Sequence, residues 1–347
     1  MSTQANSTLQ VTVNGAYDYI TACIKAKLVP MLSGSPAIGK SAVMHQIAAD
    51  YQLKVIDMRL SQCDPTDLCG FPTINEKTGR AGYAPMDTFP LKGDAIPEGY
   101  KGWLVFFDEL TSAPRGVQAA AYKPILDRMI GTHEIHDKVA IVAAGNLETD
   151  GAIVEAMSTA LQSRMVHFEL TVDSKEWIDW AAGHDIDHRI LSFIRFKPDN
   201  LYTFKADHTD KTYGSPRTWE FANRFIKGHD VVDQKMLPLL AGTISEGLAR
   251  EFMSFLRIYD RLLTLPAILA APDTVAVPDE PSILYALTGA IANGANEKTV
   301  GGLMTFVNRL PIEFQVVTLR DIVRRKKELL AHPSVQKWVT IKATDLF

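Results

Sequence analysis

The chain has 347 residues, of which 46% are hydrophobic and 22% are charged. This composition excludes a disordered or collagen-like protein, and the length allows two or three domains of about 100–200 residues. The 36 Lys and Arg residues stand against 40 Asp and Glu residues, so the formal net charge is −4. A mildly acidic chain is not a general polyanion binder, and a nucleic-acid role would need a local basic site.

The cysteines and the N-terminus bear on the cellular environment. Cys23, Cys63 and Cys69 are odd in number and widely spaced, which indicates reduced thiols rather than a disulfide framework or a zinc finger. Residues 1–11 contain no Lys or Arg and no apolar block, so they do not resemble a secretory signal. No apolar run approaches the roughly 18 residues that a membrane span needs. We therefore expect a soluble, cytoplasmic protein with no membrane partner.

Helices and strands alternate at the start of the chain. Residues 1–15 predict an N-terminal arm, and the apolar residues of 16–26 recur at helical spacing. The apolar run at 28–33 predicts a strand, in which Pro30 is tolerable near the start. A helix is expected at 40–51 and a second strand at 55–60.

The next segment, residues 61–101, is rich in turn-forming residues such as Asp64-Pro65 and Cys69-Gly70. Residues 73–83, with Gly79 near the middle, predict a hairpin. Long irregular stretches in compact domains are usually functional or mobile, so we expect this segment to be mobile.

Strands and helices continue to alternate as far as residue 170. Buried strands of a parallel sheet are expected at 103–107, 139–144 and 166–170, with a helix at 115–128. This alternation predicts a doubly wound α/β domain over residues 16–172.

The pattern then becomes helical, first over a predicted lid at 173–235 and then over a C-terminal region at 236–347. Helices are expected at 175–182, 187–196, 215–227 and 243–264. A Pro-rich linker or loop is expected at 266–281, and three or four helices over 282–346.

A phosphate-binding motif lies between the strand at 28–33 and the helix at 40–51. The pattern G-x-x-x-x-G-K-[ST] is met by Gly34, Ser35, Pro36, Ala37, Ile38, Gly39, Lys40 and Ser41. Glycines let the backbone N–H groups of such a loop point at phosphate oxygens, and the N-terminus of the following helix adds its dipole. Lys40 would reach the β- and γ-phosphates, and the Ser41 hydroxyl would bind Mg²⁺. The motif therefore predicts binding of a nucleoside triphosphate with Mg²⁺.

Polar residues follow two of the predicted strands. Asp108 would hold the Mg²⁺ shell, and Glu109 would position and polarise the attacking water. An acidic pair at a helix N-terminus is the alternative. Asn146 is placed to hydrogen-bond the γ-phosphate and the attacking water, although asparagine is also common in turns.

Two arginines complete the series. Arg164 precedes the last predicted strand, and Arg217 follows a proline at the start of a predicted helix. A lone arginine is normally a solvated charge, but the order of loop, acids, asparagine and arginines, each at the edge of an element, favours a functional set. The helix expected before Arg164 would point it away from its own nucleotide, towards a neighbouring subunit. Its apolar positions are Ile153, Val154, Met157 and Leu161.

Together these motifs resemble those of the AAA+ ATPases, and within them the MoxR-like branch. The resemblance rests on residues 34–41 (Walker A), 106–114 (Walker B), 143–147 (sensor 1), 151–165 (around the arginine finger) and 215–217 (sensor 2). Residues 67–70 resemble the start of the helix-2 insertion, and residues 128–136 resemble a pre-sensor hairpin. The resemblance spans about residues 16–228 and does not extend over residues 236–347.

The resemblance implies a P-loop AAA+ core with a helical lid, assembled as a ring, most commonly a hexamer, with ATP at the subunit interfaces. Arg164 would reach the neighbour's γ-phosphate, with Arg115 and Arg128 as rival arginine fingers. Arg217 would couple the lid to nucleotide in its own subunit. MoxR-like proteins commonly act as remodelling chaperones, often beside a partner with a von Willebrand A-type domain. We therefore expect Mg²⁺-dependent ATP hydrolysis that remodels a protein client.

Two departures and two alternatives accompany this interpretation. Ala37 stands where the usual loop has a further glycine, and residues 145–147 replace the usual Thr-x-Asn-Pro, but neither change removes a functional group. A nucleic-acid motor or loader shares the core, and its support is the basic run 324–327 with Arg320 one turn earlier. A solvated helix face is the simpler explanation of that run. A non-hydrolysing nucleotide-gated scaffold is the other alternative, and Glu109 and Asn146 argue against it.

Overall fold

The computed structural model describes residues 9–74, 76–77, 79–151 and 154–346. It divides the chain into two compact units, the first comprising residues 1–173 and 205–207 and the second comprising residues 174–204 and 208–347. Each unit is described separately. Over the described residues, every helix is either too short or too polar to cross a bilayer.

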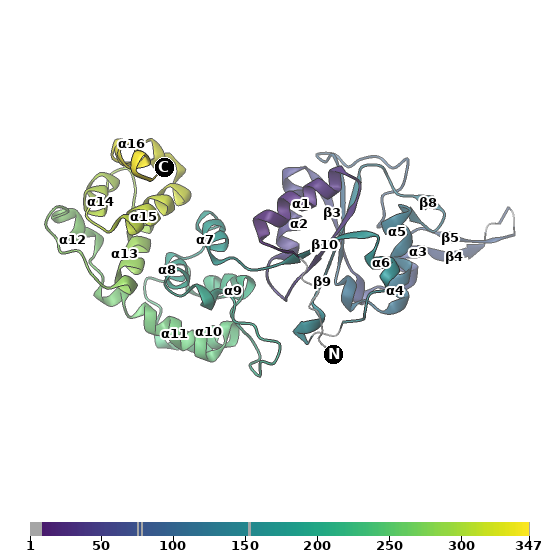
Figure 1. Cartoon of the computed structure of the whole chain (residues 1–347), viewed down its shortest axis with the longest axis horizontal. Helices are drawn as coiled ribbons and strands as arrows, with labels where there is room; N and C mark the ends of the chain where they lie inside the picture. Colours follow the sequence, from purple (N-terminus) through teal and green to yellow (C-terminus); the bar gives the residue numbers. More distant parts are fainter. Residues whose placement is uncertain (1–8, 75, 78, 152–153, 347) are drawn as a thin grey trace. The chain divides into compact units, whose positions relative to one another are not determined.

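The first unit is built on a sheet in which six strands are described, all of them parallel to their neighbours (Figure 1). In sheet order the strands are β1 (Gln10–Val11), β10 (Met165–Leu170), β2 (Val29–Ser33), β9 (Val139–Gly145), β6 (Gly102–Asp108) and β3 (Leu53–Arg59). The predicted α/β fold class is confirmed. Parallel strands of this kind are buried on both faces, which is why β6 and β9 consist of continuous apolar runs.

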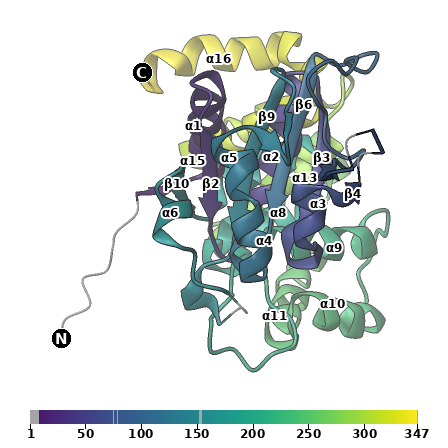
Figure 2. The same cartoon turned by 90° about the vertical axis from the view of Figure 1, so that its right-hand side faces the viewer.

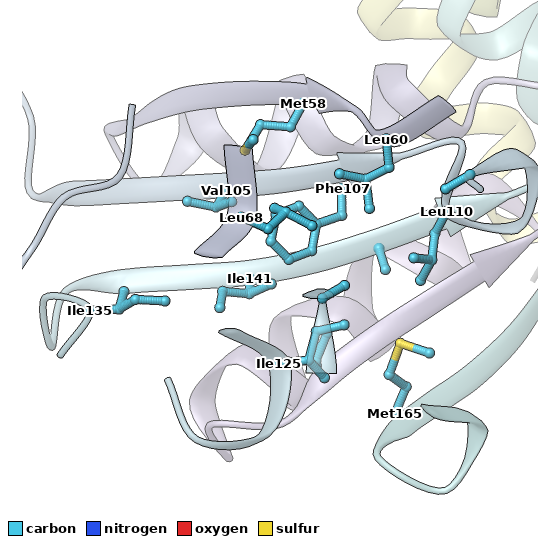
Figure 3. Packing of buried hydrophobic residues seen from close by; sticks show 14 of the residues in the cluster. Met58, Leu60, Leu68, Val105, Phe107, Leu110, Ile125, Ile135, Ile141 and Met165 are labelled. Atoms are coloured by element: carbon cyan, nitrogen blue, oxygen red, sulfur yellow. The ribbon is translucent and has the colours of Figure 1, made fainter. Parts of the chain in front are cut away.

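Side chains alternate between the two faces of the sheet. Val105, Phe107 and Ile141 enter one apolar cluster with Leu68 and Ile125 (Figure 3). This face is covered by α3 (Pro65–Cys69), α4 (Arg115–Ala120) and α5 (Tyr122–Leu126), which lie in front of the sheet in Figure 2.

The opposite face is covered by α1 (Val13–Lys25) and α2 (Lys40–Asp50), which contact β9 and β6 respectively. Its side chains Leu104, Phe106 and Val142 have no solvent exposure. Each buried side chain of this size stabilises the fold by about 1.5–3 kcal/mol. The two layers together hold the carboxyl ends of the strands rigidly in place.

The region between β3 and β6 contains the predicted hairpin, formed by β4 (Phe71–Ile74) and β5 (Ala81–Ala84). A second small hairpin, β7 (Met129–Ile130) with β8 (His133–Glu134), lies where the pre-sensor hairpin was expected. Part of the 61–101 segment is nevertheless anchored. Phe89 is 2% exposed, and its ring packs edge-on against Phe107 with the centroids 6.4 Å apart. Mobility throughout this segment is therefore not expected.

The second unit is helical over its described residues. Its α-helices are α7 (Ser174–Gly183), α8 (His188–Phe196), α9 (Pro216–Ile226), α10 (Leu237–Ile244), α11 (Glu246–Leu256), α12 (Leu265–Ala270), α13 (Pro281–Gly294), α14 (Val300–Val307), α15 (Ile312–Arg325) and α16 (Pro333–Leu346). A buried ion pair joins α8 to α15, with Arg195 Nη2 2.6 Å from Asp321 Oδ1. One compact unit thus contains both the predicted lid and the predicted C-terminal region.

Three predicted elements were wrong in extent. The helix expected at 243–264 is interrupted at Ser245, which has φ 82° and separates α10 from α11. The helix expected at 115–128 is divided at Ala121 into α4 and α5. The Pro-rich stretch expected as a loop begins with α12, because Pro266 occupies a position in the first helical turn, where its missing N–H costs nothing.

The helix expected before Arg164 was also wrong. Only α6 (Thr159–Gln162) is α-helical there, and residues 154–158 are not helical. Ile153 lies outside the described residues. The argument that a long helix points Arg164 outward therefore loses its basis, although the residue keeps its place just before β10.

Candidate nucleotide site

The predicted phosphate-binding loop connects β2 to α2 at the carboxyl edge of the sheet. Glycine is required at two of its positions. A Cβ on Gly34 would lie 2.5 Å from Ile38 Cδ1 and 3.0 Å from the carbonyl oxygen of Leu170. Gly39 has φ 108°, a conformation that side-chain-bearing residues rarely adopt. The two glycines of the sequence pattern therefore lie at positions where the backbone requires glycine.

Ala37 adopts φ 61°, in the left-handed region that favours glycine. An L-residue there costs about 1–2 kcal/mol. The loop thus keeps a glycine-type backbone at a residue that is not glycine, and the strain is held within the predicted phosphate-binding loop.

Lys40, the first residue of α2, connects the loop to the tip of β9. Its ammonium donates to the carbonyl oxygens of Gly34 at 2.6 Å and Ser35 at 3.0 Å, and to Asn146 Oδ1 at 3.0 Å. Two predicted site residues that are 106 positions apart are thereby brought into direct contact. Phosphate oxygens would offer the same ammonium stronger, charged acceptors.

The predicted metal ligands also meet. The Ser41 hydroxyl donates to Asp108 Oδ2 at 3.3 Å. Burial raises the pKa of Asp108. The hydrogen bond from the Glu109 N–H and the Lys40 ammonium oppose the rise, while the Asp57 and Glu109 carboxylates add to it. A half-buried carboxylate beside other acids, hydrogen-bonded to a hydroxyl, fits the oxygen ligands that Mg²⁺ prefers, because a bound divalent cation would offset the unfavourable charge.

Glu109 follows at the end of β6 with φ 57° and ψ 30°. Its N–H donates to Asp108 Oδ1 at 2.8 Å, which fixes the two carboxylates relative to each other. The Ser61 hydroxyl donates to Glu109 Oε2. Left-handed backbone at a non-glycine residue is strained, and such strain concentrates at functional sites.

Asn146 is held through its own backbone by Thr111. Its N–H donates to Thr111 Oγ1 at 2.9 Å, and its carbonyl oxygen accepts from the same hydroxyl at 3.1 Å. Thr111 can approach this closely because residue 145 is glycine, where a Cβ would lie 2.4 Å from Thr111 Oγ1. The position of the Asn146 amide is therefore set by a threonine and a glycine.

The arginines occupy different surroundings. The Arg164 guanidinium lies 5.5 Å from the centroid of the Tyr122 ring, and its Nη1 donates to the carbonyl oxygen of Ala160 at 2.5 Å. Arg115 is exposed and forms a 3.0 Å ion pair with Glu155.

Arg128 does not lie at the loop, because its contacts are at the other end of β9. Arg128 Nη2 donates to the carbonyl oxygens of His136 and Val139, at the end of β9 opposite to Asn146. Burial lowers the pKa of Arg128. Arg217 belongs to the second unit, where it is exposed in the first turn of α9.

Sequence reasoning missed Ser61, Thr111 and Asp57, which contact or electrostatically influence predicted site residues. It also missed a cavity of about 280 Å³ between α1 and α2. This cavity is lined by Val13, Asn14, Tyr17, Asp18, Val43 and Gln46. A single hydroxyl or aliphatic side chain has no sequence signature of its own, so these residues can be identified only from their contacts in the folded structure.

No model of a protein family matches the chain, and no curated protein matches it. Similar solved structures include a RuvB variant from Thermotoga maritima, with 19% identity over 77% of this chain and 84% of that chain and a TM-score of 0.39. The RuvB Holliday junction branch migration motor of the same organism gives 16% identity, 80% coverage of each chain and a TM-score of 0.37. A candidate ATPase from Cytophaga hutchinsonii gives 15%, with 97% and 90% coverage and a TM-score of 0.36. Similarity at this level adds nothing to the argument for function.

Proposed function

We propose that this chain is a Mg²⁺-dependent ATPase of the AAA+ type. The observation that carries the proposal is the convergence of four predicted residues at one edge of a parallel sheet. Lys40 contacts Asn146 at 3.0 Å, and Ser41 contacts Asp108 at 3.3 Å. Ligands of open α/β sheets bind outside the carboxyl ends of the strands, where these side chains lie.

Each side chain has a distinct part in hydrolysis. The loop N–H groups and Lys40 would bind the phosphates, and Ser41 and Asp108 would hold Mg²⁺, which when bound supplies positive charge to the phosphate oxygens. Glu109 orients the attacking water and accepts its proton, once its contact with Ser61 opens. Asn146 aligns that water with the γ-phosphate.

The cavity between α1 and α2 is the proposed site of the adenine base. It adjoins the loop, since a Cβ on Gly39 would lie 3.8 Å from Val13 Cγ2. Val13 and Val43 offer apolar contact to the base, and Asn14 and Gln46 offer amide groups to its edge.

We further propose a ring, as the MoxR-like resemblance implies, in which Arg164 acts on the nucleotide of a neighbouring subunit. Its guanidinium lies beside the Tyr122 ring and, among the described residues, forms no ion pair with a carboxylate. Action on a protein client, with a von Willebrand A-type partner, belongs to the same proposal. Arg164→Ala should then hydrolyse ATP slowly alone and regain activity when mixed with Lys40→Ala subunits. Mixed rings without regained activity would contradict the in-trans role.

The alternative of a nucleic-acid motor loses its main support, because most of the basic run is engaged within the second unit. Arg320 and Arg324 pair with Asp179. The Arg325 side chain donates to the carbonyl oxygen of Ile186, and Lys326 donates to backbone carbonyls of Asn293 and Ala295. Side chains with such partners are poorly available to phosphates.

Steady-state phosphate release tests the ATPase proposal. The parental chain should hydrolyse ATP with Mg²⁺ and not with EDTA, and Glu109→Gln should be inactive. Lys92→Ala is a matched control, because Lys92 forms only an exposed ion pair with Glu134 in the same unit. Hydrolysis by Glu109→Gln at the parental rate would show that the assignment of the base is wrong.

A further inference from the structure

A second cavity lies at the opposite edge of the same sheet, where the strands begin. It has a volume of about 460 Å³, and its floor is aliphatic, formed by Ile24, Val29, Ile47, Leu53, Ile125 and Ile141. The volume falls within the range of ligand pockets, about 300–1,000 Å³.

The cavity exists because β2 and β9 separate at this end. They are paired only from Met31 opposite Ala143 to Ser33 opposite Gly145. Val29 therefore lies beyond the described pairing with β9, although it pairs with Met165 of β10, and Pro30 has no N–H with which to extend the ladder to β9.

Cations surround the opening. Lys25, Lys27, Lys101, Lys138 and Arg128 line it, against a single acid, Asp137. The local balance is 5 − 1 = +4, in a chain whose net charge is −4. Within the described residues, none of the four lysine ammonium groups has an ion-pair or hydrogen-bond partner.

Large apolar side chains are exposed beside these cations. Leu28 and Leu126 are each 52% exposed, and Tyr51 is 40% exposed. All three line the cavity. An exposed apolar patch with a polar or charged rim is typical of a site that binds a partner.

We propose that this cavity binds a short acidic segment of a partner protein, with one or two large apolar side chains inserted between Asp or Glu residues. The aliphatic floor takes the apolar side chains, and the lysines take the carboxylates. A nucleic-acid strand fits less well, because bases stack on aromatic rings, and Tyr51 is the one aromatic residue among those described at the cavity.

The proposed docking cavity is separate from the nucleotide loop. β9 runs between the two ends of the sheet, and its seven residues span about 20 Å at roughly 3.3 Å each. The inference therefore does not depend on ATP hydrolysis, and its test does not use it.

Fluorescence anisotropy with labelled 12-residue peptides tests the proposal on the full chain. In the probe peptide, Glu or Asp alternates with Leu or Phe. Two comparison peptides replace the apolar residues by Ser or the acidic residues by Lys. The third comparison ligand is a single-stranded 12-nucleotide DNA. The acidic–apolar peptide should bind with micromolar Kd and at least tenfold more tightly than the others.

Charge reversal locates the binding. Lys27→Glu with Lys138→Glu lowers the local balance from +4 to 0 and should weaken binding of the acidic–apolar peptide at least tenfold. The matched control, Lys211→Glu with Lys235→Glu, makes the same charge change at exposed positions of the second unit and should have no effect. The proposal would be overturned if the charge-reversed and control variants bound the acidic–apolar peptide equally well. It would also be overturned if the parental chain did not bind this peptide, or bound the serine peptide or the DNA equally well.

Discussion

Thr111→Val offers a direct test of how the site is built. Thr111 is 7% exposed, and its hydroxyl bonds both the N–H and the carbonyl oxygen of Asn146. Valine keeps the shape of the side chain and removes both bonds. A buried group left without its partner costs about 1–3 kcal/mol. Two groups lose their partner, which would cost about 2–6 kcal/mol; because Asn146 is half-buried and water recovers part of this, we expect a loss of about 2–4 kcal/mol.

ATP turnover should fall as well, because the Asn146 amide loses its position beside Lys40. A displacement of about 1 Å in a catalytic group can cost about 10²-fold in rate, and we expect a fall in ATP turnover of that order. Thermal unfolding and hydrogen exchange over β9 measure the first effect, and phosphate release measures the second.

Thr21→Val is the matched control. Thr21 is 8% exposed, and its hydroxyl donates only to the carbonyl oxygen of Asp18, within α1. The control should lose less than about 1 kcal/mol and keep its turnover. If the two variants behave alike in unfolding and in turnover, Thr111 does not position Asn146 and the reasoning is refuted.

Three further predictions concern charge and backbone strain. Asp108→Asn should raise the melting temperature of the nucleotide-free chain near neutral pH, because a carboxylate with a raised pKa destabilises the fold when it is ionised. The difference in melting temperature between the variant and the parent should vanish as the pH falls below the folded pKa of Asp108. Stabilisation by MgATP should be lost in the variant. Ala37→Gly should stabilise the chain by up to about 1 kcal/mol, whereas Gly39→Ala should destabilise it; the opposite order would show that the loop strain is misassigned. Asp321→Asn should cost about 3–5 kcal/mol in thermal unfolding by leaving buried Arg195 without its counter-charge, and a cost below about 1 kcal/mol would contradict this.

The sequence was most informative where one physical signal acted alone. Continuous apolar runs marked β6 and β9, because a strand buried on both faces admits few polar residues. The glycines marked the turn between β2 and α2, because the backbone conformation constrains those positions strongly. Both signals are local, and both placed these elements correctly.

Signals that depend on tertiary context were not readable. Ser245 interrupts a helix in a left-handed conformation, although serine gives no strong break signal and the apolar periodicity continues on both sides. The contact of Ser61 with Glu109 joins residues 48 positions apart. The basic run at 324–327 is a similar case, since its partners on α7 and α13 are far away in the sequence.

Identifying the nucleotide that two variants retain tests whether residues 34–41 and Glu109 form an ATP-hydrolysing site. Glu109→Gln and Lys40→Ala chains would be incubated with Mg²⁺ and ATP, passed through a desalting column and denatured, and the released nucleotide identified by chromatography. We expect Glu109→Gln to retain intact ATP, because the loop and metal ligands remain while the water is not activated, and Lys40→Ala to retain none. Retention of ATP by Lys40→Ala equal to that of Glu109→Gln, or retention of ADP alone by Glu109→Gln, would contradict the assignment of residues 34–41 and Glu109 to an ATP-hydrolysing site.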